Sequence, residues 1–143
     1  MTTTTLHPIM TATEPSTTDA TRASWMRRWL QAEGAATFAI GLAAFLWLGL
    51  PWYAFAVLLL VPDLSMLGYL RGPRVGAIAY NVAHDLATGV VVFGVGVASG
   101  IVPVAAIGAV LIAHSGMDRL AGYGLKFPTA FGDTHLGHIG KGR

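Results

Sequence analysis

The sequence predicts an all-α protein, a bundle of four transmembrane helices whose termini both lie on the cytoplasmic side. Hydrophobic residues make up 54% of the chain and charged residues only 11%, far below the roughly 25% of soluble domains. No Asp, Glu, Lys or Arg occurs in residues 34–62 or 86–117, and each gap exceeds the roughly 20 residues that cross a bilayer. These observations indicate a multi-pass protein of the cell (inner or plasma) membrane rather than a soluble helical domain.

Residues 1–24 are polar and rich in Thr, and they contain little that a core could bury. We therefore expect a disordered N-terminal tail here. The next segment, residues 25–29 (WMRRW), places two arginines between two tryptophans. Tryptophan rings favour the headgroup layer and basic residues favour the cytoplasmic side, so this segment predicts an anchor at the inner membrane surface.

The two long apolar stretches must each turn back once. A continuous helix over residues 30–71 would be about 63 Å long, roughly twice the thickness of the hydrocarbon core. Pro51 cannot continue a helix, and residues 99–103 (SGIVP) contain a second break with Gly and Pro. The expected helices are residues 30–49, 52–70, 75–98 and 102–121, within a transmembrane domain over residues 25–121.

Basic residues orient the predicted bundle. All nine Lys and Arg residues lie before the first helix, between the second and third, or at and after the end of the fourth, and the other two loops carry no charge. Because cytoplasmic loops carry the excess of Lys and Arg, both termini should be inside. Residues 122–143 are too polar and Gly-rich for another span and predict an irregular cytoplasmic C-terminal segment.

Composition also excludes several classes of function. The chain has no cysteine, so it has no disulfide, no thiol nucleophile and no cysteine-based zinc or iron–sulfur site. The net charge of +2 is modest and no nucleic-acid motif is present, so we expect no nucleic-acid partner. The expected partners are membrane lipid and a second copy of the chain in a homodimer, because four helices are few for enclosing a pocket.

Acids and histidines inside the predicted helices point to a site. An ionisable residue at the centre of a membrane helix costs about 2.5–3.5 kcal/mol, so such residues face the bundle interior and often have a function. The helices contain Glu33, Asp63, His84, Asp85, His114 and Asp118, with Asn81 as a neutral companion. The topology places all of them in the cytoplasmic half of the membrane, where we expect a common pocket. Pro62 also leaves a backbone carbonyl one turn earlier without its donor, able to bind an ion or a neighbouring side chain.

A metal centre is the leading interpretation of these residues. His84 and His114 would supply nitrogen ligands to a divalent zinc, manganese or iron ion. Asp63 and Asp118 would supply oxygen ligands. An open position on such an ion activates water for the hydrolysis of an ester, with Glu33 or Asp118 as a general base. The sequence therefore predicts a metal-dependent hydrolase of a lipid or other amphipathic substrate.

Three alternatives stay open. His84 and His114 could hold a haem for electron transfer, the acids and histidines could form a proton or ion path for transport, or the polar residues could only bond the helices together. Arg119 either neutralises Asp118, contacts a lipid phosphate or is an ordinary positive charge on the inner side, and the same alternatives hold for Lys126. His135 either folds back onto the site as another ligand or stays solvated.

Two stretches are fairly specific: PDLSMLGYLRGPRVGAIAYNVAH (residues 62–84) and AHSGMDRLAGYGLKFPTAFGDTHLG (residues 113–137). They resemble the small bacterial membrane proteins of the domain-of-unknown-function 4260 family, and the resemblance spans about residues 31–137. It implies four membrane helices and no established activity. The polar positions that it implies are Glu33, Asp63, Asn81, His84, His114, Asp118, Arg119, Tyr123, Lys126 and His135.

Overall fold

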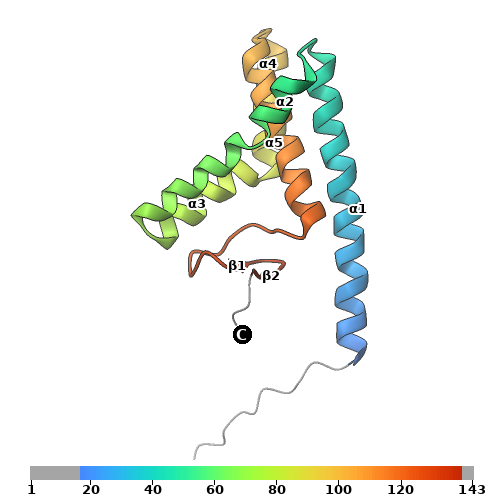
Figure 1. Cartoon of the computed structure of the whole chain (residues 1–143), viewed down its shortest axis with the longest axis vertical. Helices are drawn as coiled ribbons and strands as arrows, with labels where there is room; N and C mark the ends of the chain where they lie inside the picture. Colours follow the sequence, from blue (N-terminus) through green and yellow to red (C-terminus); the bar gives the residue numbers. More distant parts are fainter. Residues whose placement is uncertain (1–16, 140–143) are drawn as a thin grey trace, which may run out of the picture.

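The computed structural model describes residues 17–139, and the fold over these residues is all-α apart from one small hairpin. The elements, in order, are α1 (Thr17–Trp47), α2 (Trp52–Leu58), the 3₁₀ helix η1 (Val61–Arg71), α3 (Pro73–His84), α4 (Leu86–Ser99), α5 (Val102–Ala121), β1 (Asp133–Thr134) and β2 (Gly137–His138) (Figure 1). The all-α prediction is confirmed.

Apolar helices long enough to cross a membrane are present. Three segments meet this condition, Thr21–Trp47, Trp52–Arg71 and Val102–Ala121. The pair α3 and α4 makes a fourth if it is counted as one span bent by 52°. Large apolar side chains such as Trp47, Val57 and Leu70 are exposed on these helices, as expected for surfaces that face lipid.

The beginning of α1 differs from the prediction. Residues 17–24, which we assigned to the disordered tail, are helical and continuous with the first span. This stretch contains neither Gly nor Pro, and extending an existing helix costs much less than starting one. The rest of the predicted tail, residues 1–16, lies outside the described residues.

The second and third predicted helices are each divided. After α2 the chain continues as η1, with Pro62 in its first turn, because proline has no N–H for the α-helical pattern. The helix predicted over residues 75–98 ends at His84 and restarts at Leu86. Between them, Asp85 takes an extended conformation, and its carboxylate accepts the N–H of Thr88 at 3.2 Å as the N-cap of α4.

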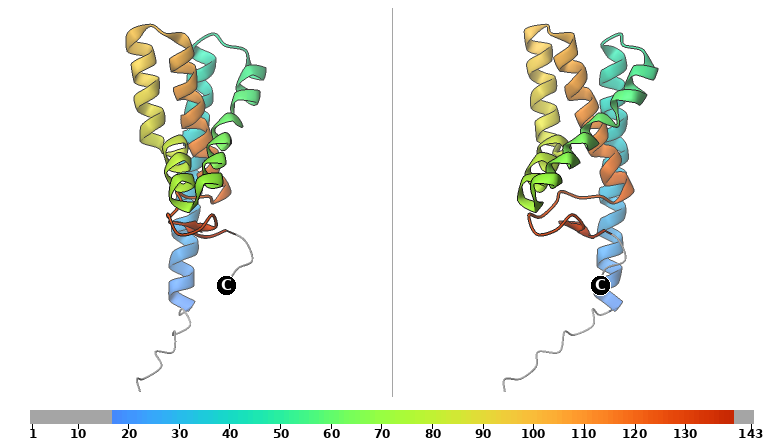
Figure 2. Two further views of the ribbon diagram at one scale, coloured as in Figure 1. Left: turned by 90° about the vertical axis from the view of Figure 1, so that its left-hand side faces the viewer. Right: turned by 60° about the vertical axis from the view of Figure 1, so that its left-hand side comes forward.

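Helix α5 is the centre of the bundle, with α1 against one side and α4 against another (Figure 2). Glycines permit these close approaches. A Cβ at Gly41 of α1 would lie 2.5 Å from the backbone nitrogen of Ala113, and one at Gly34 would lie 2.6 Å from that of Leu120. Gly108 of α5 meets the backbone of Phe93 in α4 in the same way.

An apolar core fills the end of the bundle near the turn between α1 and α2. Phe45 of α1 and Phe55 of α2 meet edge to face with ring centroids 5.3 Å apart. They pack with buried residues of α5, namely Ala106, Ala109, Val110 and Ala113. The polar residues of α5 follow directly after this core, so the polar site begins where the apolar core ends.

The other end of the molecule is built from η1, α3 and the C-terminal segment. Helices η1 and α3 pack side by side and lean away from the axis of the bundle (Figure 1). Residues 122–139 run beneath the ends of α3 and α5 and close into the hairpin of β1 and β2 (Figures 1 and 2). The segment therefore covers the place where η1, α3 and α5 meet.

Candidate metal-binding site

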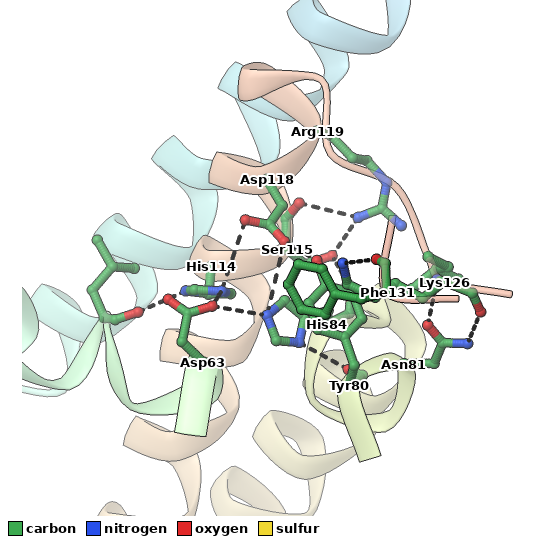
Figure 3. Close-up of polar contacts among 12 residues, drawn as sticks. Asp63, Tyr80, Asn81, His84, His114, Ser115, Asp118, Arg119, Lys126 and Phe131 are labelled. Carbon is green, nitrogen blue, oxygen red and sulfur yellow. Dashed lines mark hydrogen bonds and ion pairs between the residues drawn. The ribbon is translucent and has the colours of Figure 1, made fainter. Parts of the chain in front are cut away.

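Three side chains from three helices meet near the C-terminal half of α5. Nε2 of His84 lies 3.3 Å from Oδ1 of Asp63, and Nε2 of His114 lies 3.4 Å from the same oxygen (Figure 3). One potential ligand atom of each residue lies within 4.8 Å of the other two. The histidine side chains are 1% and 0% exposed, whereas that of Asp63 is 38% exposed. The structure thus brings together three of the four predicted ligands in one cluster.

Backbone carbonyls orient both imidazoles. Nδ1 of His84 donates to the carbonyl of Tyr80 at 2.8 Å, and Nδ1 of His114 donates to the carbonyl of Leu59 at 2.6 Å. A carbonyl only accepts, so the proton of each neutral ring lies on Nδ1 and the lone pair lies on Nε2. Leu59 stands three residues before Pro62, which has no N–H to give it. This is the freed carbonyl that the sequence predicted.

The resulting cluster turns two ring nitrogens toward one carboxylate. When both rings are neutral, the two Nε2 lone pairs face Asp63, whereas a proton on Nε2 of His84 would be donated to Oδ1 of Asp63 at 3.3 Å. Among the residues that the structure describes, Nε2 of His114 has no hydrogen-bond partner. Histidines that bind metals characteristically donate their other nitrogen to a carbonyl or carboxylate, as both do here. The arrangement therefore suits a cation.

Asp118 lies slightly farther from the cluster. Its Oδ2 is 3.8 Å from Nε2 of His84, and its Oδ1 is 3.8 Å from Nε2 of His114. The hydroxyl of Tyr80 donates to Oδ2 at 2.6 Å, and the Tyr80 ring stacks on His84 with centroids 3.7 Å apart. Tyr80 thus fixes both Asp118 and His84, although sequence reasoning did not select it. Its spacing of four residues from His84 was the available signal.

Ser115 joins α5 to the break between α3 and α4. Its hydroxyl donates to the carbonyl of His84 at 2.8 Å. In a continuous helix that carbonyl would accept the N–H of Thr88, which here bonds to Asp85 instead. Arg119 donates to the hydroxyl and carbonyl of Ser115. Within residues 17–139 Arg119 makes no ion pair with Asp118, so its role is to hold Ser115.

Asn81 attaches the C-terminal segment to α3. Its amide donates to the carbonyl of Lys126 at 2.9 Å and accepts the N–H of Lys126 at 2.7 Å. The Lys126 side chain is 5% exposed and donates to the carbonyl of Phe131 at 2.8 Å. Burial lowers the pKa of the Lys126 ammonium, an effect that the nearby negative charge of Asp118 partly offsets. Lys126 is therefore an interior group rather than a charge on the surface.

The remaining predicted residues lie around the cluster or away from it. Glu33 is exposed on α1. The buried face of α1 follows Gly34, Thr37 and Gly41, and at 100° per residue Glu33 falls beside that face. The structure does not bring Glu33 into the cluster.

His135 does fold back toward the site, but as a neighbour. Its Nδ1 accepts the N–H of Leu125 at 2.9 Å, and its side chain lines a small hollow next to His84 and Asp118. Tyr123 is 45% exposed and lines the same hollow. Neither residue belongs to the cluster of Asp63 and the two buried histidines.

A cleft of about 350 Å³ adjoins the cluster. It is lined by Asp63, Met66, Tyr80, Met117, Asp118, Tyr123, Lys126, Phe131 and Ile139. Both carboxylates of the site thus reach a space large enough for part of a small molecule. The cleft lies between η1, α3, α5 and the C-terminal segment.

Comparison with known proteins gives one match. The sequence model of the family described as "Domain of unknown function (DUF4260)" matches residues 27–139. This range includes every predicted site residue and confirms the resemblance seen in residues 62–84 and 113–137. No curated protein and no solved structure matches the chain.

Proposed function

The chain belongs to the DUF4260 family, and we propose that it is a metal-dependent hydrolase embedded in the cell membrane. One observation carries the proposal: two buried imidazoles donate Nδ1–H to backbone carbonyls and turn both Nε2 lone pairs onto one carboxylate oxygen of Asp63. Without a cation, Nε2 of His114 stays without a hydrogen-bond partner among the described residues, and an unpaired buried polar group costs about 1–3 kcal/mol.

The distances from Asp63 to the two histidines support a tetrahedral ion such as zinc. Ligand atoms about 2.0–2.1 Å from a tetrahedral ion lie about 3.3–3.4 Å from one another. Asp63 Oδ1 lies 3.3 and 3.4 Å from the two histidine nitrogens. Direct hydrogen bonds between charged groups would be shorter, at about 2.7–2.9 Å. Manganese and iron also accept two histidines with carboxylates.

The groups around the proposed ion site support a hydrolytic reaction. A divalent ion with three protein ligands keeps an open position, at which it can activate water and polarise an ester. Asp118 is the general base: Tyr80 binds its Oδ2, and Oδ1 remains on the side of His114. Glu33, the other base considered from the sequence, lies outside the cluster, so this proposal assigns it no role.

The membrane placement is part of the proposal. Four spans, formed by α1, α2 with η1, α3 with α4, and α5, place both termini in the cytoplasm. The candidate spans and the distribution of the basic residues support this arrangement. The cluster then lies near the cytoplasmic surface, where an ester group of a lipid or other amphiphile can reach it. The second partner that we propose is another copy of the chain in a homodimer.

The structure favours this function over haem binding and transport. The ring centroids of His84 and His114 are 4.6 Å apart and the rings meet edge to face, so a flat macrocycle has no place between them. Both Nε2 atoms also face Asp63. For transport, a polar path would have to continue through the described bundle, but the core beyond the cluster consists of apolar residues.

Metal analysis tests the proposal. The protein is purified in detergent without added metal, dialysed against zinc, manganese or iron(II), and analysed for bound metal. We expect about one ion per chain in the wild type and at least about tenfold weaker binding in His114→Ala and Asp63→Asn. His138→Ala is the matched control, because His138 pairs with Asp133 at 2.7 Å in the C-terminal hairpin, away from the cluster. Equal metal contents in wild type and His114→Ala would overturn the proposal.

A further inference from the structure

Lys126 is buried without a carboxylate partner. Its side chain is 5% exposed, although lysine is almost never buried to this degree unless it is paired. The ion pairs within residues 17–139 do not include it. Its ammonium carries three donors, and the described part of the chain uses one, on the carbonyl of Phe131. The other two donors are available to a ligand.

Two aromatic rings hold the ammonium in place. It lies 3.8 Å from the centroid of the Phe131 ring and 4.7 Å from that of Tyr80. Such contacts stabilise a desolvated cation and fix its position. Because Tyr80 also binds Asp118 and stacks on His84, one ring connects the ammonium to the candidate metal ligands. Lys126 therefore keeps a fixed place beside the cluster.

The cleft next to Lys126 is lined by both polar and apolar side chains. Asp63, Asp118, Lys126 and Tyr123 contribute the polar groups. The apolar groups are Met66, Met117, Phe131 and Ile139. If an ion occupies the cluster, Asp63 is a ligand and Asp118 faces the ion, and the ammonium is then the remaining charged group of the cleft. A ligand that matches this lining carries both an anionic group and a hydrocarbon chain.

We propose that this cleft binds an amphiphile through a phosphate or carboxylate group that Lys126 holds, with the hydrocarbon part along Met66, Met117 and Phe131. The substrate class is accordingly an acidic lipid or a related anionic amphiphile. This inference rests on the proposed function for the reaction that follows binding. The binding step itself involves Lys126 and can be measured without turnover.

The test measures binding of monododecyl phosphate to the full-length protein in a non-ionic detergent, by titration calorimetry, with inorganic phosphate and dodecyltrimethylammonium as the comparison ligands. We expect monododecyl phosphate to bind at least about tenfold more tightly than either, because inorganic phosphate lacks the hydrocarbon chain and dodecyltrimethylammonium lacks the anion for the charge-assisted contact. Lys126→Met should weaken binding about tenfold or more, and Lys126→Arg should retain most of it. Arg71→Gln is the matched control, because Arg71 is exposed and lines a different hollow.

Two results would overturn the inference. Equal affinity of wild type and Lys126→Met for monododecyl phosphate would show that the ammonium does not bind the anion. Equal affinity for inorganic phosphate and monododecyl phosphate would identify a soluble anion as the ligand. Thermal unfolding of Lys126→Met, measured beside Lys126→Arg, which keeps a donor for the carbonyl of Phe131, separates loss of binding from loss of fold. Lys126→Met separates the two proposals: it should keep the metal and lose monododecyl phosphate, whereas metal binding with no effect of Lys126→Met on monododecyl phosphate leaves only the proposed function standing.

Discussion

His114 shows how the cluster differs from ordinary buried histidines. A buried imidazole normally uses both nitrogens in hydrogen bonds, but here Nδ1 is bonded to Leu59 and Nε2 is left among acceptors. The side chain cannot turn to relieve this, because it is fully buried and packed edge to face against His84. A bound cation would convert this unfavourable arrangement into ligand bonds, and the packing would hold the nitrogens in position for it.

The proposed role of Asp118 as the general base can be tested with a single substitution. Asp118→Asn keeps the hydrogen bond from Tyr80 and the volume of the side chain but cannot accept a proton. We expect hydrolysis of a chromogenic long-chain ester to fall by about 10²–10⁴-fold, the usual contribution of a general base, with the metal content unchanged. Asp133→Asn, in the exposed hairpin, is the control. A variant that lost its metal as well would instead make Asp118 a ligand.

At the scale of elements, the site depends on two interruptions of helices. Pro62 leaves the carbonyl of Leu59 to His114, and the cap at Asp85 leaves the carbonyl of His84 to Ser115. Each break therefore supplies an acceptor to a side chain of α5. Continuous helices would keep both carbonyls in their own backbone bonds.

Pro62→Ala tests the first break. Alanine restores an N–H that can bond to the carbonyl of Leu59 or Leu58, and the Leu59 carbonyl would then be shared with His114. Removing the groups that orient metal ligands typically lowers metal affinity about 10–100-fold, and we expect a loss in this range by competition with a chromogenic chelator. Pro103→Ala is the matched control, since Pro103 also opens a helix but lies far from the cluster in α5. Equal affinities in both variants would contradict the role of the Leu59 carbonyl.

The close contact of α1 and α5 leads to a second prediction about elements. Gly41→Ala would place a Cβ 2.5 Å from the backbone nitrogen of Ala113, so the two helices must separate. Overpacking of this kind costs about 1–3 kcal/mol, and the midpoint of thermal unfolding in detergent should fall. Gly94→Ala meets no atom within 4 Å and should leave the midpoint unchanged or raise it. If Gly41→Ala and Gly94→Ala have the same midpoint of thermal unfolding, the close contact between α1 and α5 does not limit stability.

The sequence could predict the helices and much of the site for a physical reason. Uncharged apolar runs have few alternatives to membrane helices, and placing Asp63, His84 and His114 at similar depths follows from counting residues along those helices. The break at Asp85 could not be predicted in this way. Its spacing from Asn81 and His84 fits a polar stripe on one continuous helix as well as it fits a cap.

The residues that contact the C-terminal segment also could not be predicted from the sequence. Asn81 and Lys126 are 45 residues apart, and periodicity within a helix carries no information about such a pair. Glu33 shows a different limit: residue counting predicts its depth, but its direction around α1 depends on the glycines that pack on α5. The depth of a residue in the membrane can be predicted from a sequence of this kind. The direction in which its side chain points depends on which face of its helix packs against a neighbouring helix.

At the scale of the whole molecule, the apolar core and the polar cluster occupy opposite ends of the bundle. The turns after α1 and α4 lie at the end of the core, and the C-terminal segment lies at the end of the cluster (Figure 1). The candidate site therefore lies at one end of the molecule. If the basic residues orient it as proposed, the cleft opens toward the cytoplasm, and the hairpin of β1 and β2 lies between the cleft and the aqueous phase.

Cysteine labelling decides this orientation, and the chain suits the method because it contains no cysteine. Ser99→Cys places a thiol at the exposed end of α4, whereas Arg74→Cys and Ala130→Cys place one at exposed positions in the first turn of α3 and in the C-terminal segment. With a maleimide that cannot cross the membrane, we expect intact cells to label only the first variant, and permeabilised cells to label all three. Labelling of Ser99→Cys and Arg74→Cys from the same side would mean that α3 and α4 form a re-entrant pair, because a span must separate their ends. Labelling of Ala130→Cys in intact cells would mean that the bundle has the opposite orientation in the membrane. The cleft would then face substrates outside the cytoplasm.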